Sequence, residues 1–297
     1  MTTTLNRSVL IGLIGHGVGP SLTPPMHEME GARQGLRYLY RTIEFNPDND
    51  PRQRLMELIR NARAFGFDGL NLTYPVKQTA LSLLDEMSTS AHMVGAVNTV
   101  RWQDGRLIGH NTDVSGFQAA LDDALGSEPL GRIVLIGAGG AGSAVSHAVA
   151  MRGAEHLTIV DADPHRARAL ANNISAVHHQ TVDASSVDAL PGLLPLAQGL
   201  INATPIGMAD HPGSAVDANL LRPPLWVCDV VYRPVETELL LTARHRGCRT
   251  ISGLGMAMHQ AADAFELFTG ETADRSAMLT HLKHLVAAEN SSQPDHQ

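Results

Sequence analysis

Cysteine and long apolar runs are scarce in this 297-residue chain. The two cysteines, Cys228 and Cys248, have no metal-binding or redox spacing, which argues against a disulfide framework and favours a reducing cytoplasm. The apolar run from Val9 to Ile14 is too short to span a bilayer and is broken by Gly12. It also lacks a cationic lead, so we expect neither a membrane span nor an export signal.

Positive charge is also in short supply. The chain has 22 Lys and Arg against 30 Asp and Glu, a formal net charge of -8, and no basic run. This balance argues against a nucleic-acid partner and against an anionic membrane surface. The 15 histidines are scattered without a paired-ligand pattern, so we assign no metal site. A hydrophobic content of 43% is typical of a globular protein. With nucleic acid and membrane disfavoured, we expect the partner to be a small-molecule substrate.

Short β-rich runs alternate with helical patterns along the chain. The strand-like runs are SVLIGLIG, YLYRTIEF, GLNLTYP and AVNTVRW in the first third, then RIVLIGA, HLTIVDA, GLINATP and LWVCDVV. Apolar residues at helical spacing mark segments such as PRQRLMELIRNARAF and TELLLTARHRG. This alternation predicts an α/β fold built on mostly parallel sheets covered on both faces.

The turn-rich segment 113–131 separates two α/β halves. We expect a substrate-binding catalytic domain over residues 1–112. A Rossmann-type, doubly wound dinucleotide-binding domain is expected over residues 113–255, including a connecting helix. The helical patterns in residues 256–289 could return to the first domain, and the polar residues 290–297 predict a flexible tail.

The strongest local signal is RIVLIGAGGAGSAVSHAVAMRGAEHLTIVDAD. Gly137, Gly139 and Gly142 match G-x-G-x-x-G between a strand and a helix, and a second strand delivers Asp161 nineteen residues after the last glycine. The glycines permit a tight turn, a close approach of the backbone to a pyrophosphate and close helix packing. Glycines that serve packing alone are the alternative, but strand, helix, strand and acid together favour a dinucleotide site.

Asp161 bears on which dinucleotide binds. A carboxylate there accepts hydrogen bonds from the ribose 2'-OH and repels a 2'-phosphate. Asp163 adds a second negative charge, so NAD is favoured over NADP. Arg166 keeps NADP open, because its guanidinium could face either an adenine ring or a phosphate.

Lys77 and Asp113 are candidates for proton transfer. In GLNLTYPVKQTALSLL we expect Lys77 in the first turn of a helix, where the dipole disfavours a cation and suits a general base. A solvated surface lysine is the commoner explanation of this stretch alone. Asp113, in GHNTDVSGF, stands at an expected N-cap, which by itself would explain an aspartate. Beside the lysine, it would instead orient a base that takes a proton from an alcohol.

Several uncharged polar residues also require an explanation. Asn71, Thr73 and Asn98 lie in or beside apolar runs, where an unpaired amide or hydroxyl costs free energy. They need polar partners, either each other or a ligand rich in hydroxyls. Ser21 and Thr23 form a hydroxyl pair in GVGPSLTPPMHE, a stretch that we expect its glycines and prolines to keep out of regular structure.

Taken together, these stretches resemble the quinate/shikimate dehydrogenase family over nearly the whole chain. The matching blocks are SLTP with His27 following, NLTYPVKQ, GAVNTV, GHNTDVSGF, GAGGAG, NATPIGM, DVVYRPVETELL and GLGMAMHQAADAF. The resemblance implies a two-domain enzyme that oxidises one ring hydroxyl of quinate or shikimate and passes hydride to a nicotinamide. The products would be 3-dehydroquinate and 3-dehydroshikimate.

The resemblance also implies roles for individual residues. Lys77 and Asp113 would be the catalytic proton-transfer pair. The substrate-binding set would be Ser21, Thr23, Asn71, Thr73, Lys77, Asn98, Asp113, Tyr232 and Gln260. The cofactor-binding set would be Gly137, Ala138, Gly139, Gly140, Ala141, Asp161, Arg166, Asn202, Thr204, Pro205, Val230, Gly253 and Met256.

Two departures from the commonest biosynthetic pattern of this family favour its NAD-linked quinate/shikimate subgroup. Thr23 replaces a serine, and Glu28 follows His27 where asparagine is usual. The run from Asp161 to Asp163 replaces an Asn-Arg-Ser/Thr stretch suited to NADP. The alternatives are an NADP-linked shikimate dehydrogenase, an aminoshikimate dehydrogenase and, from another class, a non-catalytic NAD-sensing protein. The sequence leaves monomer and homodimer open.

Overall fold

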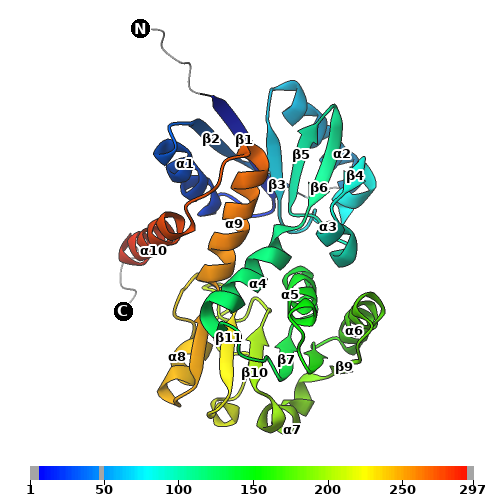
Figure 1. The fold of residues 1–297 in the computed structure, drawn as a ribbon, viewed down its shortest axis with the longest axis vertical. Helices are drawn as coiled ribbons and strands as arrows, with labels where there is room; N and C mark the ends of the chain where they lie inside the picture. Colours follow the sequence, from blue (N-terminus) through cyan, green and yellow to red (C-terminus); the bar gives the residue numbers. More distant parts are fainter. Residues whose placement is uncertain (1–6, 47–49, 293–297) are drawn as a thin grey trace. The chain divides into compact units, whose positions relative to one another are not determined.

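The chain folds into two compact α/β units, shown in the computed structural model of Figure 1. The structure describes residues 7–46 and 50–292. Unit 1 comprises residues 1–112 and 260–297, and unit 2 comprises residues 113–259. Each unit contains a six-stranded sheet in which parallel pairing dominates. The α/β fold that the alternation of strand and helix predicts is therefore confirmed.

Unit 1 is built on a sheet with the strand order β2-β1-β3-β5-β6-β4. Strands β1, β2 and β3 are parallel, whereas β5 runs antiparallel to both of its neighbours, β3 and β6. The elements are β1 Ser8–Gly15, α1 Thr23–Arg33, β2 Arg37–Glu44, α2 Pro51–Ala64, β3 Gly69–Leu72, the 3-10 helix η1 Thr79–Leu83, β4 Glu86–Met87, α3 Thr89–Val94, β5 Thr99–Gln103 and β6 Arg106–His110.

Both faces of the β2-β1-β3 part of this sheet are covered. On one face, Ile14 of β1 and Leu72 of β3 pack with Leu55 of α2 in a buried cluster. On the other face, the ring of Tyr38 stacks on Phe265, with ring centroids 5.3 Å apart. Strands covered on both faces need apolar residues at successive positions, which explains the continuous apolar run of β1.

A hairpin that the sequence analysis did not identify joins β5 to β6. Asp104 and Gly105 have φ angles of 50° and 80°, as a two-residue type I' turn requires. The Asp-Gly pair between two β-rich runs is the usual sequence signal for such a turn. The signal was therefore present in RWQDGRLIG.

Three local predictions are wrong. Helix α1 begins at Thr23, so Pro24 and Pro25 start a helix, because a first-turn residue has no intrahelical acceptor for its N–H. Residues 74–78 form turns, and η1 begins only at Thr79, so the dipole argument for Lys77 has no α-helix to rest on. Helix α4 begins one residue before Asp113, which places that carboxylate inside the first turn rather than at the N-cap.

Unit 2 is an all-parallel sheet with the strand order β12-β11-β10-β7-β8-β9. From β7 the chain builds outward through β8 to β9, then returns to the other side of β7 for β10 to β12. This is the doubly wound topology, in which ligands bind outside the carboxyl ends of the strands where the order reverses. The elements are α4 Thr112–Leu125, β7 Arg132–Ile136, α5 Gly140–Met151, β8 His156–Val160, α6 Pro164–His178, β9 Val182–Ser185, η2 Val187–Ala189, α7 Leu190–Leu193, η3 Leu194–Leu196, β10 Gly199–Asn202, η4 Ala218–Leu220, β11 Trp226–Asp229, α8 Glu238–His245 and β12 Arg249–Ser252.

Two helices end the described chain, α9 Leu254–Thr269 and α10 Arg275–Ser292. Within unit 1, α10 lies beside α1 (Figure 1). The expected tail began at residue 290, but α10 continues through Ser292, and residues 293–297 lie outside the described part.

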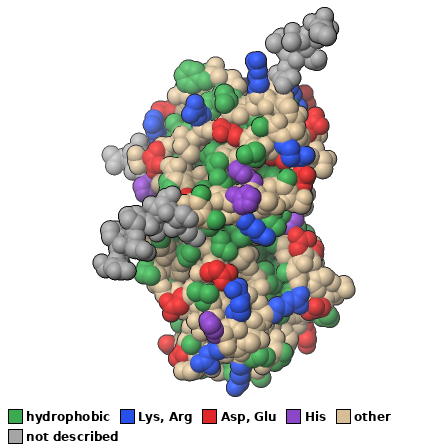
Figure 2. All heavy atoms as spheres, turned by 90° about the vertical axis from the view of Figure 1, so that its left-hand side faces the viewer, with side chains coloured by type: hydrophobic (Ala, Val, Ile, Leu, Met, Phe, Trp, Pro, Cys, Tyr) green, Lys and Arg blue, Asp and Glu red, His purple; other side chains and the backbone are tan. Residues whose placement is uncertain are grey.

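The described helices and one face of the surface can be compared with the hydrophobicity and charge of the sequence. None of the helices in residues 7–46 and 50–292 is long and apolar enough to cross a membrane. On the face drawn in Figure 2, acidic and basic side chains are interspersed, and neither sign forms a continuous patch.

Candidate active site

Unit 1 brings several predicted substrate residues to one edge of its sheet. This edge is formed by the carboxyl ends of β1 and β3 and by the amino end of the antiparallel β5. The N–H of Thr73, just after β3, donates to the carbonyl of Ile14 at 3.0 Å. The carbonyl of Lys77 accepts the N–H of Val97 at 3.0 Å, which places the lysine backbone beside the residue that precedes Asn98.

The hydroxyl pair lies where β1 gives way to α1. The Ser21 hydroxyl oxygen accepts the N–H of Thr23 at 3.3 Å, and both residues are half-buried. Glu44, at the end of β2, holds the preceding loop by accepting the N–H groups of Gly17 at 2.6 Å and Val18 at 3.3 Å. Glu44 has no signal in the sequence, because only strand pairing shows that it faces this loop.

The buried amides have the polar partners that their burial requires. Asn71 and Asn98 are 5% and 3% exposed. Nδ2 of Asn71 donates to the carbonyl of Asn98 at 3.1 Å and to Oγ1 of Thr99 at 2.8 Å. Nδ2 of Asn98 donates to Oγ1 of Thr112 at 2.9 Å, and its Oδ1 accepts the N–H of Thr112 at 2.9 Å. Thr99 and Thr112 belong to this edge, although sequence analysis did not identify them.

The remaining predicted substrate residues are divided between the units. Gln260, on α9, is half-buried and belongs to unit 1. Asp113 and Tyr232 belong to unit 2, where Asp113 is buried and Tyr232 is half-buried.

The glycine loop of unit 2 has the geometry of a dinucleotide cradle. Gly137 has a φ of 104°, which favours glycine strongly. A Cβ on Gly142 would lie 1.8 Å from the carbonyl oxygen of Gly137, so only glycine permits this packing of α5 on β7. Gly139 caps α5 without any side-chain hydrogen bond, and a Cβ on Gly140 would meet no atom within 4 Å. These features fit a pyrophosphate bound at the helix N-terminus.

Asp161 and Arg166 both border this loop. Oδ2 of Asp161 accepts the N–H of Ala138 at 2.6 Å, and Oδ1 accepts the N–H of Asp163 at 2.9 Å. The carboxylate therefore joins the end of β8 to the glycine loop. Arg166 is exposed, and its guanidinium lies 3.4 Å from the position of a Cβ on Gly139.

A buried carboxylate organises the loops after β10 and β11. Asp229 is fully buried and accepts hydrogen bonds from Nδ2 of Asn202 at 2.9 Å, Oγ1 of Thr237 at 2.7 Å and the N–H of Val231 at 3.0 Å. Burial raises the pKa of Asp229, although these hydrogen bonds oppose the shift. Oδ1 of Asn202 accepts the N–H and hydroxyl of Thr204 at 3.1 and 2.7 Å. Asn202 therefore shapes the segment that contains Thr204 and Pro205.

The last strand of unit 2 ends in another position that requires glycine. A Cβ on Gly253 would lie 2.3 Å from the carbonyl oxygen of Val230, so the ends of β11 and β12 approach closely. Met256 follows in the first turn of α9 and is half-buried. Gly253 and Val230 thus lie at the same sheet edge as the glycine loop, because all six strands are parallel.

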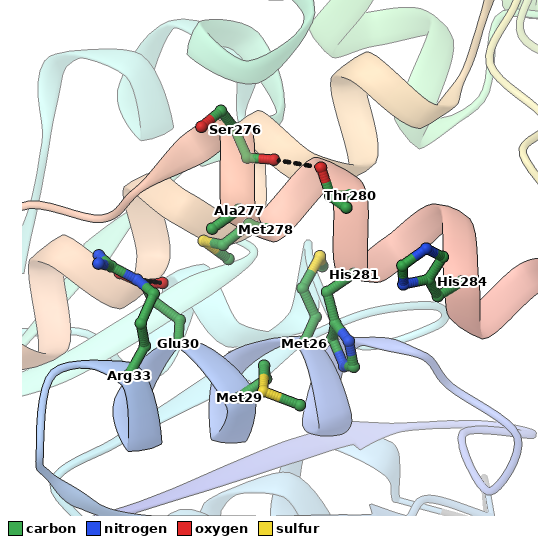
Figure 3. A pocket seen from close by; sticks show the side chains of 10 residues that line it. All are labelled: Met26, Met29, Glu30, Arg33, Ser276, Ala277, Met278, Thr280, His281 and His284. Atoms are coloured by element: carbon green, nitrogen blue, oxygen red, sulfur yellow. Dashed lines mark hydrogen bonds and ion pairs between the residues drawn. The ribbon is translucent and has the colours of Figure 1, made fainter.

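A separate hollow of about 360 Å³ lies between α1 and α10. Figure 3 shows the side chains of Met26 and His281 entering the space between the two helices. One side is bounded by Glu30, which forms an ion pair with Arg33 at 2.8 Å. None of its ten lining residues is a predicted site residue. No set of three His, Cys, Asp or Glu in the described residues, here or elsewhere, is grouped to hold a metal ion.

Family models match most of the chain. The shikimate dehydrogenase substrate binding domain matches residues 13–100, and the shikimate 5'-dehydrogenase C-terminal domain matches residues 253–283. Between them, the saccharopine dehydrogenase NADP binding domain matches residues 133–209. The glycine loop thus falls within a model of nicotinamide-dinucleotide binding.

Two curated relatives each match more than nine-tenths of the chain. A shikimate dehydrogenase (NADP(+)) of Pseudarthrobacter chlorophenolicus is 53% identical, covering 95% of this chain and 97% of its own. A quinate/shikimate dehydrogenase (NAD(+)) of Corynebacterium efficiens is 48% identical, covering 91% and 96%.

A solved structure agrees with these relatives in fold. The quinate dehydrogenase of Corynebacterium glutamicum in complex with NAD is 45% identical and has a TM-score of 0.88, covering 94% of this chain and 100% of that one. The chain therefore belongs to the shikimate dehydrogenase family, whose members are oxidoreductases that act on CH–OH groups.

Proposed function

We propose that this protein is an NAD-dependent quinate/shikimate dehydrogenase. It would oxidise one ring hydroxyl of quinate or shikimate, reversibly, to 3-dehydroquinate or 3-dehydroshikimate. The observation that carries the proposal is the gathering of Thr73, Lys77 and Asn98 at one sheet edge in a chain whose relatives are named quinate and shikimate dehydrogenases.

The substrate would be held by its carboxylate and by its hydroxyls. Ser21, Thr23 and Tyr232 take the carboxylate in this proposal. The residues assigned to ring hydroxyls are Asn71, Thr73, Asn98, Asp113 and Gln260. The fixed loop before Ser21 supports the first assignment, because Glu44 anchors its backbone. The hydrogen-bonded carboxamide of Asn98 supports the assignment of ring-hydroxyl residues, since a fixed donor orients a ligand better than a mobile one.

Lys77 accepts the hydroxyl proton in the proposed reaction. Asp113, buried in the first turn of α4, orients the lysine and the substrate. As the O–H bond breaks, its electron pair forms the carbonyl π bond, and hydride leaves the same carbon. The nicotinamide cofactor supplies the acceptor for that hydride when bound.

The dinucleotide would be held by the glycine loop and the neighbouring strand ends of unit 2. Gly137, Gly139 and Gly140 provide the pyrophosphate cradle in this proposal, since Gly137 has a φ of 104° and the space beside Gly140 is open. Asp161 supports NAD, because a carboxylate at the end of β8 accepts from a ribose hydroxyl and repels a phosphate.

NADP is the second candidate cofactor. The Pseudarthrobacter relative, at 53% identity, is named as NADP-linked. Arg166 also favours this candidate, because its guanidinium borders the glycine loop beside Gly139 and arginine pairs well with phosphate.

Steady-state kinetics with each pair of substrates tests both proposals. We expect turnover of quinate and shikimate, with a higher kcat/KM for NAD than for NADP. A clear NADP preference would contradict the assignment of NAD as cofactor, but the assignment of dehydrogenase activity would still hold. Absence of turnover with every pair, together with nucleotide-dependent binding of a protein partner, would favour a non-catalytic NAD-sensing protein.

A further inference from the structure

A chain of hydrogen bonds crosses unit 1 from its edge strand β2 to the start of β5. The hydroxyl of Tyr40 donates to Oδ1 of Asn71 at 2.6 Å. Nδ2 of Asn71 donates to Oγ1 of Thr99 at 2.8 Å, and that hydroxyl donates to Oδ1 of Asn98 at 3.1 Å. Each member donates to the next, so the chain has one direction.

The geometry of the sheet brings Tyr40 to Asn71. Tyr40 pairs with Ile11 of β1, and Asn71 pairs with Leu13 two residues further along the same strand. Residues i and i+2 of a strand point to the same face, so the tyrosine and the asparagine share one face of the sheet across β1. Both are almost completely buried, at 4% and 5% exposure.

The direction of the chain follows from one group that can only accept. Nδ2 of Asn71 also donates to the backbone carbonyl of Asn98 at 3.1 Å. A flipped Asn71 would turn its own oxygen toward that carbonyl, which has no hydrogen to donate. Tyr40 favours the observed orientation from the opposite side, because its hydroxyl donates to Oδ1. Without the hydroxyl, Oδ1 of Asn71 loses this donor. The free-energy difference between the two orientations of the Asn71 amide then becomes smaller.

Tyr40 is itself held in place. Its N–H donates to Oε1 of Glu28 at 2.9 Å, and its ring packs edge-to-face with that of His27 at a centroid distance of 5.0 Å. Burial raises the pKa of Tyr40 well above its ordinary value, which keeps the hydroxyl a donor at any ordinary pH. The start of the chain is therefore a fixed donor rather than a rotating one.

We propose that Tyr40 is a positioning residue for the substrate site, acting through Asn71 and Thr99 on the carboxamide of Asn98. This rests on the proposed function, in which Asn98 binds a ring hydroxyl. Tyr40 lies on β2, and β1 separates this strand from β3, which contains Asn71. In this role Tyr40 does not need to touch the substrate. Its hydroxyl favours the observed orientation of the Asn71 amide, which in turn directs the Thr99 hydroxyl toward Oδ1 of Asn98.

Tyr40→Phe tests the proposal, with Tyr38→Phe as the matched control. Tyr38 lies on the same strand and face, is equally buried at 5% exposure, and its hydroxyl bonds to Nδ1 of His27 at 3.0 Å. Each variant loses one buried hydroxyl, so both should lose similar stability. We expect Tyr40→Phe to raise the KM for shikimate about five- to tenfold, the size expected for one neutral hydrogen bond, with the KM for NAD unchanged. Tyr38→Phe should leave both constants unchanged, and equal KM changes in the two variants would overturn the proposal.

Thr99→Val breaks the same chain further along. Because Tyr40 acts through Thr99, the double variant Tyr40→Phe with Thr99→Val should have a shikimate KM within about twofold of that of Thr99→Val alone. A KM that rises by the product of the two single effects would overturn the proposal, since independent structural losses add.

A readout without turnover separates this proposal from the proposed function. In 15N-labelled protein, the side-chain NH2 signals of Asn98 are identified by their absence in Asn98→Asp. Tyr40→Phe should shift these signals, and Tyr38→Phe should not. Unshifted signals would overturn the role of Tyr40 even if the wild type is active. An inactive wild type with shifted signals would instead contradict the proposed function alone.

Discussion

The two sheets position their candidate site residues by different means. In unit 2 the edge is shaped by backbone, because Gly137, Gly142 and Gly253 allow approaches that any Cβ would block. In unit 1 the edge is shaped by side chains, since buried hydroxyls and amides hold Asn98 through a connected network. Backbone geometry leaves a glycine pattern in the sequence, whereas a side-chain network joins residues far apart in it.

Lys77→Ala should give the largest effect, because the proposed chemistry of unit 1 depends on one side chain. We expect kcat to fall by about 10²- to 10⁴-fold, the usual contribution of a general base, with little change in NAD affinity. The chain offers a matched control in its only other lysine, the exposed Lys283 on α10, whose replacement by alanine should leave kcat unchanged. Steady-state assays measure kcat, and isothermal titration calorimetry with NAD measures the affinity. Near-normal turnover of Lys77→Ala would refute the assignment.

Gly142→Ala, in unit 2, should weaken cofactor binding, which Lys77→Ala should leave nearly unchanged. The added methyl would meet the carbonyl oxygen of Gly137, and overpacking of this kind costs about 1 to 3 kcal/mol. We expect NADH affinity to fall at least tenfold because the glycine loop must move.

The control for that variant is Gly192→Ala, in α7 of unit 2, where a Cβ meets no atom within 4 Å. Titration with NADH and thermal unfolding should show no loss in the control. Unchanged NADH affinity in Gly142→Ala would mean that the loop does not hold the dinucleotide.

Acid should destabilise both units, in part through a buried histidine in each, His27 in unit 1 and His147 in unit 2. Burial lowers the pKa of His27 to about 3, and burial followed by the nearby His178 lowers that of His147 to about 4. The unfolded state binds a proton near pH 6.5, before the folded state does, so stability is complete above that pH and falls as the pH drops. The loss continues to about pH 4 for unit 2 and to about pH 3 for unit 1. For each histidine, the full loss of folding stability is on the order of 3 kcal/mol or more.

One tryptophan in each unit makes this measurable. Trp102 lies in unit 1 and Trp226 in unit 2, so Trp226→Phe and Trp102→Phe leave a single reporter for each unit. Urea midpoints from their fluorescence should fall between pH 6.5 and 4 in both. His27→Gln should remove much of the fall for unit 1 only. A midpoint for unit 1 that does not change over this range would contradict the prediction.

Asp161→Ser should give the smallest of these effects, a change in cofactor preference. Removing the carboxylate removes its repulsion of a 2'-phosphate, so the ratio of kcat/KM for NAD to that for NADP should fall about tenfold. Because Asp161 also accepts two N–H groups of the loop, affinity for both dinucleotides should fall as well. Kinetics with both cofactors measure the ratio, and an unchanged ratio would show that Asp161 acts on the loop alone.

The sequence is most informative where one local segment carries the signal. The glycine loop, the second strand and Asp161 lie within thirty residues, and the Rossmann-type fold that they predict is confirmed. At Lys77 a helix was expected and the structure has a turn, whereas at Thr23 irregular structure was expected and a helix begins. Both predictions failed because proline fits turns as well as first helical turns. The assignments of individual site residues stay predictions, which the variants above test.

Residues with a supporting role could not be identified in this way. Tyr40, Glu44 and Asp229 each act on a segment distant in the sequence, through strand pairing or burial. A tyrosine in a strand has the same pattern whether its hydroxyl meets solvent or an amide.

The sequence by itself determined the alternation of strand and helix, the dinucleotide loop and the family, because periodicity and short motifs are local properties. Only the tertiary structure decided which polar groups meet. It showed that Asn71 is bonded to Tyr40, that Asp161 holds the glycine loop, and that Lys77 lies in a turn. The physical reason is that a buried polar group must find a partner wherever the fold provides one, and strand order rather than sequence distance sets which groups are near.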